Sequence, residues 1–510
     1  MRFRFILIGL AAGIGVVMFI GASASLHDVG FPLDDSWIHQ TYARNLAEEG
    51  EWAFIPGEPS VASTSPLFTV VLSLGYVLHI PFFVWTFIVG FLALSVAGWI
   101  ALALGEKMFP KLPFVGLFTG LAVVTSWHLV WAATSGMETM LFSTLSLAVI
   151  GLTWREISAQ KTATRGEFRR GLSTGLVGAA LTLTRPEGAG LVALAGLFVV
   201  AAQPYGSWRT EWKRYLAWGG GLALGWMAGI APYAAMNYHI SETFLPNTSA
   251  AKQAEYANLL ELPLLERYGR MFLPLVIGGQ LLMVPGVIVA FVILVKRIKR
   301  NRVALLYLLP AAWIFLDVSA YALRLPTAYQ HGRYVMPVVP HIFLYGVGGT
   351  IAIVDRARFG PVQRVASRSL GLASALIMPA FLIMGAQVYA RDVRIINTEM
   401  VTTAKWVRDH LPPNELLAVH DIGAVGYYAP RSILDLAGLV SPEVVPIIRD
   451  HEAIMEFMCT KKAQYLMVLP DQLPAISNDP RLGDLLFITN ARYAKEAGAG
   501  NMAVYRLNCP

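Results

Sequence analysis

The sequence predicts a polytopic α-helical membrane protein that carries a small external α/β domain at its C-terminal end. Of the 510 residues, 55% are hydrophobic and 14% are charged, whereas a soluble protein carries roughly 25% charged residues. Long apolar runs recur up to about residue 390, and beyond it they stop and charges and prolines return. The chain therefore divides into a membrane domain, residues 1–390, and a C-terminal domain, residues 391–510. The net charge of +7 comes from basic residues between apolar runs, a pattern typical of membrane topology rather than of nucleic-acid binding.

We expect about eleven apolar segments to cross the bilayer, for which about 20 helical residues are typical. The first extends from Phe5 to about Ala24. Its end, Ala22-Ser23-Ala24, resembles a signal-cleavage site, but we expect a retained anchor because many apolar segments follow. The other ten are expected near residues 82–104, 113–133, 137–153, 171–185, 188–203, 216–236, 272–295, 303–323, 334–354 and 369–390.

The positions of the basic residues orient these segments. The run 66–79 is apolar but short. If it does not cross, the loops that hold most of the lysines and arginines all face the cytoplasm, as the positive-inside rule requires. We therefore expect 66–79 to be re-entrant or interfacial. The N-terminus is then cytoplasmic, and the C-terminal domain lies on the external side of the membrane.

The first external loop, residues 26–65, is acidic and contains the adjacent carboxylates Asp34 and Asp35. Ionisable groups beside hydrocarbon are costly and mark a functional site by default. A neighbouring carboxylate makes its partner harder to ionise, so one is poised as a base or the pair holds a cation. The alternative is that Asp35 or Ser36 only caps the helix that extends to Ala47. That helix is amphipathic and is expected to rest on the membrane surface.

Further polar residues lie at the external ends of the apolar segments: Glu138, Arg185, Glu187, Asn247, Lys252, Arg324, His331 and Arg333. Simpler roles stay open for some of them, since Glu138 could cap the next helix and Arg185 could pair only with Glu187. His331 could be a loop residue without a task, and Asn247 begins a glycosylation sequon.

Taken together, these residues favour one chemistry. Lysine and arginine are normally depleted on the external side of a membrane. Those found there need an anionic partner, such as the phosphate of a lipid. A carboxylate can deprotonate an acceptor hydroxyl, which attacks the anomeric carbon of a sugar while cations steady the departing lipid phosphate.

The order of the motifs resembles the GT-C superfamily of glycosyltransferases across nearly the whole chain. The first external loop carries the resemblance in Leu33-Asp34-Asp35-Ser36-Trp37-Ile38, Tyr42-Ala43-Arg44-Asn45-Leu46, Pro56-Gly57-Glu58 and Thr64-Ser65-Pro66-Leu67. Later segments are similar too: Gly136-Met137-Glu138-Thr139, Leu183-Thr184-Arg185-Pro186-Glu187-Gly188, Pro246-Asn247-Thr248, Arg333-Tyr334-Val335-Met336-Pro337 and Asp421-Ile422-Gly423-Ala424-Val425-Gly426-Tyr427-Tyr428. The branch most similar holds the terminal arabinofuranosyltransferase of the mycobacterial cell wall and many bacterial relatives.

The resemblance implies an inverting transferase that moves a sugar from a polyprenyl-monophosphate donor to a hydroxyl of a cell-envelope glycan or lipid. It implies that Asp34 is the base, with Asp35 and Glu138 completing an acidic cluster. Those two residues are also the expected ligands of a divalent cation, Mg or Mn. Facing the phosphate are Arg185, Lys252, His331 and Arg333, with further site residues Arg44, Glu187 and Asn247.

The C-terminal domain is expected to contain short strands at 416–420, 432–436 and 464–469 and helices at 401–410 and 452–461. The resemblance implies that this domain helps to hold the acceptor. His420 and Asp421 are expected to be structural, with Gly423 and Gly426 providing turn freedom. Cys459 and Cys509 share the domain, where an oxidising compartment would permit a disulfide.

Other classes of protein stay open at this point. A transporter would show repeated halves and polar residues near mid-membrane, whereas the polar residues here gather at one face. A non-catalytic receptor or assembly protein would leave the paired carboxylates and the arginines without a task. Within the enzymes, the sugar could instead be transferred to protein, as in a protein O-glycosyltransferase.

Overall fold

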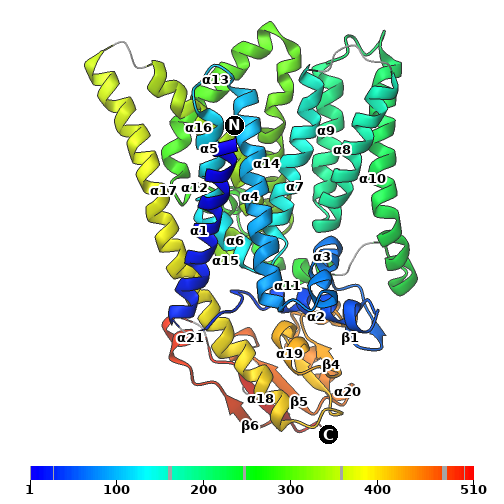
Figure 1. The fold of residues 1–510 in the computed structure, drawn as a ribbon. Coiled ribbons are helices and arrows are strands. Elements are labelled where there is room, and N and C mark those ends of the chain that lie inside the picture. The colour runs from blue at the N-terminus through cyan, green and yellow to red at the C-terminus, as the bar shows by residue number, and fades with distance from the viewer. Residues whose placement is uncertain are drawn as a thin grey trace.

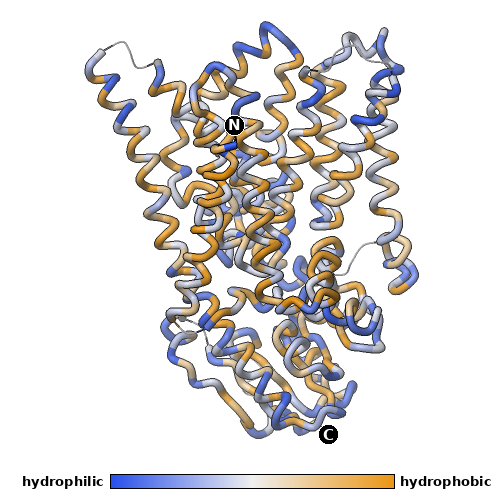
Figure 2. Tube along the Cα trace, viewed as in Figure 1, coloured by the Kyte–Doolittle hydropathy of each residue, from blue (hydrophilic) through white to orange (hydrophobic). Residues whose placement is uncertain are grey.

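The structure is a computed structural model that describes residues 2–26, 28–158, 164–244, 248–356, 360–473, 479–498 and 500–509. A bundle of long helices makes up most of the molecule, and a small sheet domain covers one end of it (Figure 1). The bundle helices are mostly hydrophobic along their length, while hydrophilic residues gather at both ends and in the sheet domain (Figure 2).

Within the described ranges, seven helical segments are long and apolar enough to cross a membrane, or eight if one bent pair counts as a crossing. Their main helices are α1 (Arg2–Leu26), α4 (Phe82–Met108), α7 (Thr139–Thr153), α13 (Val284–Arg300), α14 (Leu309–Arg324), α16 (Val339–Arg356) and α17 (Pro361–Ile396). The bent pair is α5 (Val115–Val124) and α6 (Trp127–Thr134), which meet at 51°.

Three further predicted segments are helices that fall short of this criterion: α8 (Thr164–Thr184), α9 (Gly188–Ala202) and α10 (Trp212–Ser241). Helices α8 and α9 contact α7, whereas α10 packs against α8 at the edge of the bundle (Figure 1). Glycines let α8 and α10 touch backbone to backbone, since a Cβ on Gly171 would lie 2.0 Å from the Trp218 carbonyl oxygen. The expected number of eleven crossings is therefore not confirmed.

The predicted segment 272–295 is wrong as a single helix. It is divided between α12 (Leu264–Val276) and α13, and Gly278 and Gly279 lie between them with φ of 97° and 99°. Such left-handed backbone ends a helix and is readily adopted only by glycine.

The first external loop forms α2 (Asp35–Glu48), a short hairpin of β1 (Ala53–Ile55) and β2 (Glu58–Pro59), and α3 (Pro66–Val77). At 12 residues, α3 is about 18 Å long and cannot cross the hydrocarbon core alone, in line with the interfacial prediction. The expectation that α2 rests on the membrane surface is wrong. Its residues 36–43 are buried, because α3 packs on one side of α2 and α19 (Ile422–Tyr428) on another.

The membrane domain passes into the C-terminal domain without a loop, so the predicted boundary at residue 390 lies inside a helix. Helix α17 continues through a π-helical turn at Asn397–Val401 into α18 (Thr402–His410). The sheet has the order β4-β3-β5-β7-β6. Its strands are β3 (Leu417–Val419), β4 (Ile433–Asp435), β5 (Tyr465–Val468), β6 (Leu482–Ile488) and β7 (Ala503–Leu507).

Strands β3, β4 and β5 are parallel, whereas β7 runs antiparallel to both β5 and β6. The three predicted strands are present, and β6 and β7 were not predicted. The remaining helices of the domain are α20 (His451–Thr460) and α21 (Arg492–Glu496). Cys459 and Cys509 form a disulfide, with 5.2 Å between their Cα atoms, that ties α20 to the segment after β7.

An aromatic cluster joins the C-terminal domain to the first external loop and to α4. Trp37 of α2 lies 5.0 Å from the ring centre of Tyr427 and 4.8 Å from that of Tyr428, both on α19. Phe82 and Phe83 at the start of α4 pack on the same tryptophan. The C-terminal domain is therefore packed directly against α2, where Asp35 begins the helix.

Candidate active site

A cavity of about 460 Å³ lies where the first external loop meets the bundle. Its walls come from α2, the start of α7, the turn between α8 and α9, α11 (Thr248–Glu255), the end of α14 and the segment before α16. Leu439 of the C-terminal domain also lines it. Elements distant in sequence thus converge on one space, and most of their charged residues face it.

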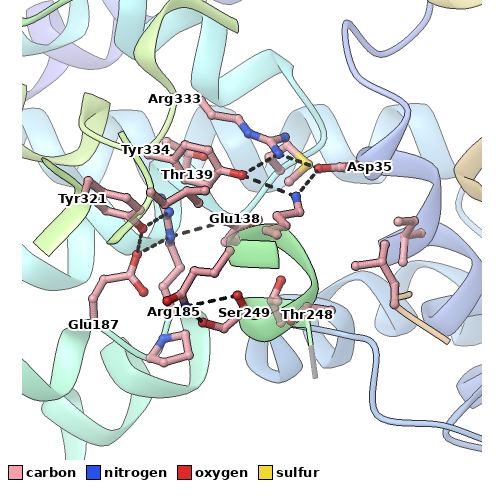
Figure 3. A pocket seen from close by; sticks show the side chains of 18 of the residues that line it. Asp35, Glu138, Thr139, Arg185, Glu187, Thr248, Ser249, Tyr321, Arg333 and Tyr334 are labelled. Carbon is pink, nitrogen blue, oxygen red and sulfur yellow. Dashed lines mark hydrogen bonds and ion pairs between the residues drawn. The ribbon is translucent and has the colours of Figure 1, made fainter. Parts of the chain in front are cut away.

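Asp35, Lys252, Arg333 and Tyr334 form the first of two charged groups in this cavity, here called the Asp35 centre. Figure 3 labels Asp35, Arg333 and Tyr334. Asp35 Oδ2 accepts hydrogen bonds from Lys252 Nζ at 3.0 Å and from Arg333 Nη2 at 2.6 Å. The Tyr334 hydroxyl accepts from the same two cations, at 3.4 and 3.2 Å. Burial alone would raise the pKa of Asp35, but the Lys252 and Arg333 cations hold it well below its usual range.

The backbone before Arg333 explains how this side chain reaches the cavity. The short helix α15 (Tyr329–Gly332) ends in three successive left-handed residues, Gln330, His331 and Gly332, with φ of 54°, 62° and 72°. Left-handed backbone is unfavourable for residues other than glycine and persists where surrounding contacts enforce it. The turn redirects the chain, and Arg333 and Tyr334 lie just before the 3-10 helix Met336–Val338 and α16.

Glu138, His39, Arg185, Glu187 and Tyr321 form the second group, the Glu138 centre. Figure 3 labels all of them except His39. Glu138 lies 3.3 Å from His39 Nε2 and 3.7 Å from Arg185 Nε. Arg185 Nε also lies 2.9 Å from Glu187 Oε1, and the Tyr321 hydroxyl accepts from Arg185 and donates to Glu187. Burial would raise the pKa of Glu138, but His39 and Arg185 lower it to about 2. Both centres therefore hold ionised carboxylates among cations.

Six of the predicted site residues line this cavity: Asp35, Glu138, Arg185, Glu187, Lys252 and Arg333. Asn247 lies outside the described residues. The alternative that Glu138 only caps a helix is not supported, because its side chain makes no capping hydrogen bond to α7. Arg185 does pair with Glu187, but it contacts Glu138 as well.

Asp34, predicted as the base, is not among the residues that line the cavity. Its Oδ2 accepts the Gly423 N–H at 2.7 Å and its Oδ1 accepts the Ala424 N–H at 2.8 Å, at the start of α19. Burial and the nearby Asp421 raise the pKa of Asp34, whereas the hydrogen bonds from the two N–H groups lower it. Adjacent residues at a helix start point in different directions, so only one of the two aspartates reaches the cavity.

Arg44 and His331 are also turned away from the cavity. Arg44 Nη1 donates to the Tyr427 carbonyl oxygen at 2.8 Å, and its guanidinium lies 4.8 Å from the centre of that ring. His331 Nε2 lies 2.8 Å from Asp392 Oδ2 of α17, which also accepts from Trp131 Nε1 at 3.0 Å. These two residues hold elements of the fold around the site.

The described residues do not fit the divalent cation predicted at Asp35 and Glu138. Each of these carboxylates already faces positively charged side chains, and no group of three His, Cys, Asp or Glu side chains suited to a metal occurs in the described parts of the chain. A cation needs several oxygen ligands free of competing cations. Metal binding at Asp35 and Glu138 stays an untested prediction.

Sequence reasoning missed Tyr321, Tyr334 and His39. Tyr334 directly follows Arg333 in the segment Arg333-Tyr334-Val335-Met336-Pro337, and this position next to a predicted site residue could have pointed to it. Tyr321 lies inside an apolar segment, where tyrosine is an ordinary residue. His39 follows Asp35 by one helical turn on the same face of α2, a spacing that could have pointed to it.

The fold is similar to that of solved GT-C glycosyltransferases. ArnT from Cupriavidus metallidurans bound to undecaprenyl phosphate aligns with a TM-score of 0.59 at 14% identity, over 98% of this chain and 97% of that one. The oligosaccharyltransferase AglB from Archaeoglobus fulgidus, in complex with an inhibitory peptide and a dolichol-phosphate, aligns with a TM-score of 0.58 at 11% identity, over 92% and 69%.

The arabinofuranosyltransferase AftD from Mycobacteria aligns with a TM-score of 0.50 at 14% identity, over 99% of this chain and 40% of that protein. The profile of a domain of unknown function (DUF8728) matches residues 387–505, the C-terminal domain. No curated protein shows significant sequence similarity to the chain. The protein thus has the GT-C fold and is a multi-pass membrane protein.

Proposed function

We propose that the protein is a glycosyltransferase that moves a sugar from a polyprenyl-monophosphate donor to a hydroxyl acceptor, with inversion at the anomeric carbon. The observation that carries the proposal is the Asp35 centre, in which one carboxylate and two cations face the same cavity. The acceptor is a cell-envelope glycan or lipid at the outer face of a bacterial inner membrane.

Arg333 supports a phosphate site because most of its donors are free. Only 4% of this residue is exposed, and its Nε and Nη1 atoms have no hydrogen-bond partner among the described residues. A buried guanidinium with unpaired donors is costly unless an anion meets them. A phosphate suits this fork, because arginine binds phosphate through two parallel N–H groups. Lys252 would add a second positive charge beside it.

Asp35 is the proposed base, in place of Asp34. With its present partners its pKa lies too low for effective proton abstraction. A donor phosphate would compete for Lys252 and Arg333 and leave the carboxylate free to accept a proton. The acceptor oxygen then attacks the anomeric carbon as its proton passes to Asp35. The bond from that carbon to the phosphate oxygen breaks, and polyprenyl phosphate leaves with the bonding electrons.

The Glu138 centre is proposed to bind the sugar. Glu138, Glu187 and Tyr321 offer acceptors and a donor to sugar hydroxyls, and Arg185 holds them in place. Polyprenyl-type phosphates bound to ArnT and AglB support the class of donor, since this chain shares their fold. The peptide bound to AglB keeps protein as a second acceptor class to be assayed.

The test uses purified protein in lipid nanodiscs with a panel of polyprenyl-phosphate sugars and with envelope glycan, lipid and peptide acceptors. Mass spectrometry follows donor loss and the release of free polyprenyl phosphate. We expect one donor to be consumed by the wild type and by Asp28→Asn, which changes an exposed carboxylate of the same loop, and not by Asp35→Asn. Consumption by Asp35→Asn at the wild-type rate would remove Asp35 as the base. If no donor in the panel is consumed with any acceptor, the transferase proposal is overturned.

A further inference from the structure

Asp34 lies beside the site but directs its carboxylate into the C-terminal domain. Both of its oxygens accept backbone N–H groups at the start of α19, at 2.7 and 2.8 Å. Its own carbonyl oxygen accepts the Trp37 N–H at 2.9 Å, which closes the first turn of α2. Asp34 therefore makes hydrogen bonds to the first residues of both helices. Its neighbour Asp35 is the first residue of α2.

The contact between α19 and α2 leaves almost no space. A Cβ on Gly423 would lie 2.0 Å from the Asp34 carbonyl oxygen, and one on Gly426 would lie 2.2 Å from the Phe54 ring. These glycines were predicted to provide turn freedom, but both lie within the helix. They are needed because the backbone of α19 approaches the first external loop so closely.

The far end of α19 is tied to the same helix. Arg44, on the third turn of α2, donates to the Tyr427 carbonyl oxygen at 2.8 Å and covers the Tyr427 ring. Tyr76 of α3 donates to the Tyr427 hydroxyl at 3.1 Å. Polar contacts at both ends, with the aromatic cluster between them, fix the position of α2 against the C-terminal domain.

The partners of Asp35 are held by other elements. Lys252 belongs to α11, and Arg333 follows a turn that His331 anchors to Asp392 of α17. A displacement of the first turn of α2 would therefore change the distances of 3.0 and 2.6 Å that join Asp35 to these cations. Misplacing a reacting group by about 1 Å can lower a rate by about 100-fold.

We propose that Asp34 is a positioning residue for the transfer reaction: by binding the start of α19, it uses the C-terminal domain to fix the base Asp35. This inference rests on the proposed function. It assigns to the C-terminal domain a part in assembling the site, in addition to any part in holding the acceptor.

Two variants test the proposal from opposite sides of the contact. Asp34→Asn keeps the size of the side chain but turns an amide toward one of the two N–H groups, so one hydrogen bond is lost. Gly423→Ala leaves Asp34 unchanged and forces α19 away from it. Asp28→Asn is the matched control. For each purified protein, kcat and the donor KM are measured together with hydrogen exchange across residues 35–48, with α20 as an internal reference.

We expect kcat to fall by about 10- to 100-fold in both variants while the donor KM changes by less than about threefold. Hydrogen exchange in α2 should rise by about tenfold and that in α20 should not change. A purely structural role would lower the yield of folded protein and leave the kcat of the folded fraction at the wild-type value, which would overturn the proposal.

Two further outcomes are decisive. If Asp34→Asn is as inactive as Asp35→Asn while Gly423→Ala is normal, Asp34 is itself the base and the positioning role is refuted. If the wild type consumes no donor, the proposed function fails, but hydrogen exchange still decides the contact. Unchanged exchange in α2 of the Gly423→Ala variant would refute the link between α19 and Asp35.

Discussion

Removing the charge of Asp35 should strengthen the binding of free polyprenyl phosphate although it abolishes transfer. In the structure Asp35 holds Lys252 and one nitrogen of Arg333, so a phosphate must compete with it. A phosphate on the free Arg333 nitrogens would lie near the Asp35 carboxylate, and a separation of about 5 Å is taken here for the Coulomb energy. Two like charges at that separation repel by about 3 kcal/mol at an effective dielectric constant of 20 and by about 1 kcal/mol in water.

The partial exposure of Asp35, whose side chain is 29% accessible, favours the lower part of this range. Because about 1.4 kcal/mol corresponds to a factor of ten, Asp35→Asn should lower the Kd for polyprenyl phosphate by about tenfold. The assay is equilibrium binding of undecaprenyl phosphate to protein in nanodiscs at fixed ionic strength, with Asp28→Asn as control. Weaker binding to Asp35→Asn than to the wild type would refute the reasoning, since it would mean that the carboxylate helps to hold the lipid.

Three other predictions concern the surroundings of the site. Arg185→Met leaves Glu138 and Glu187 without their cation and should destabilise the protein by about 3 kcal/mol. In thermal unfolding, adding Glu138→Gln should restore part of the lost stability. No recovery in the double variant would contradict the pairing of Arg185 with Glu138. The double variant Cys459→Ser with Cys509→Ser opens a loop of 50 residues and should lower the stability of the C-terminal domain by about 4 kcal/mol. Denaturant unfolding of that domain measures the loss, and an unchanged midpoint would contradict the prediction. Burial lowers the pKa of His420, but neighbouring carboxylates raise it to about 9. The charged histidine therefore stabilises the fold fully below about pH 6.5, and this stabilisation is lost as the pH rises through 9. The melting temperature of the wild type should fall over that range, and His420→Gln should remove the fall.

The members of the site could be predicted from the sequence because charges are rare in this chain. A cation or carboxylate at the end of an apolar segment has few explanations, so Glu138, Arg185, Lys252 and Arg333 stood out without any knowledge of the fold. Tyrosine gives no such signal, because it occurs at membrane interfaces for reasons unrelated to chemistry. For that reason Tyr321 and Tyr334 appeared only with the structure.

The roles of Asp34 and Asp35 could not be separated from sequence. They have the same chemistry, and their difference depends on α19, which lies nearly 390 residues further along the chain. The same helix explains why α2 was wrongly expected at the membrane surface. An amphipathic pattern shows that one face is buried but not what covers it, and here α19 and α3 cover the remaining faces as well.

Because α17 continues into α18 without a break, the C-terminal domain is joined to the bundle by a helix as well as by its contacts with the first external loop. One helical segment of 50 residues, Pro361–His410, links the bundle to this domain. This helix joins the bundle and the C-terminal domain within one chain, so the association of α19 with α2 is intramolecular. Effective concentrations for tethered partners reach the millimolar range. The N–H groups of Gly423 and Ala424, Arg44 and the aromatic cluster around Trp37 are therefore enough to hold the domain against the first external loop. If the covalent link were cut, the same contacts would bind the separated domain only weakly.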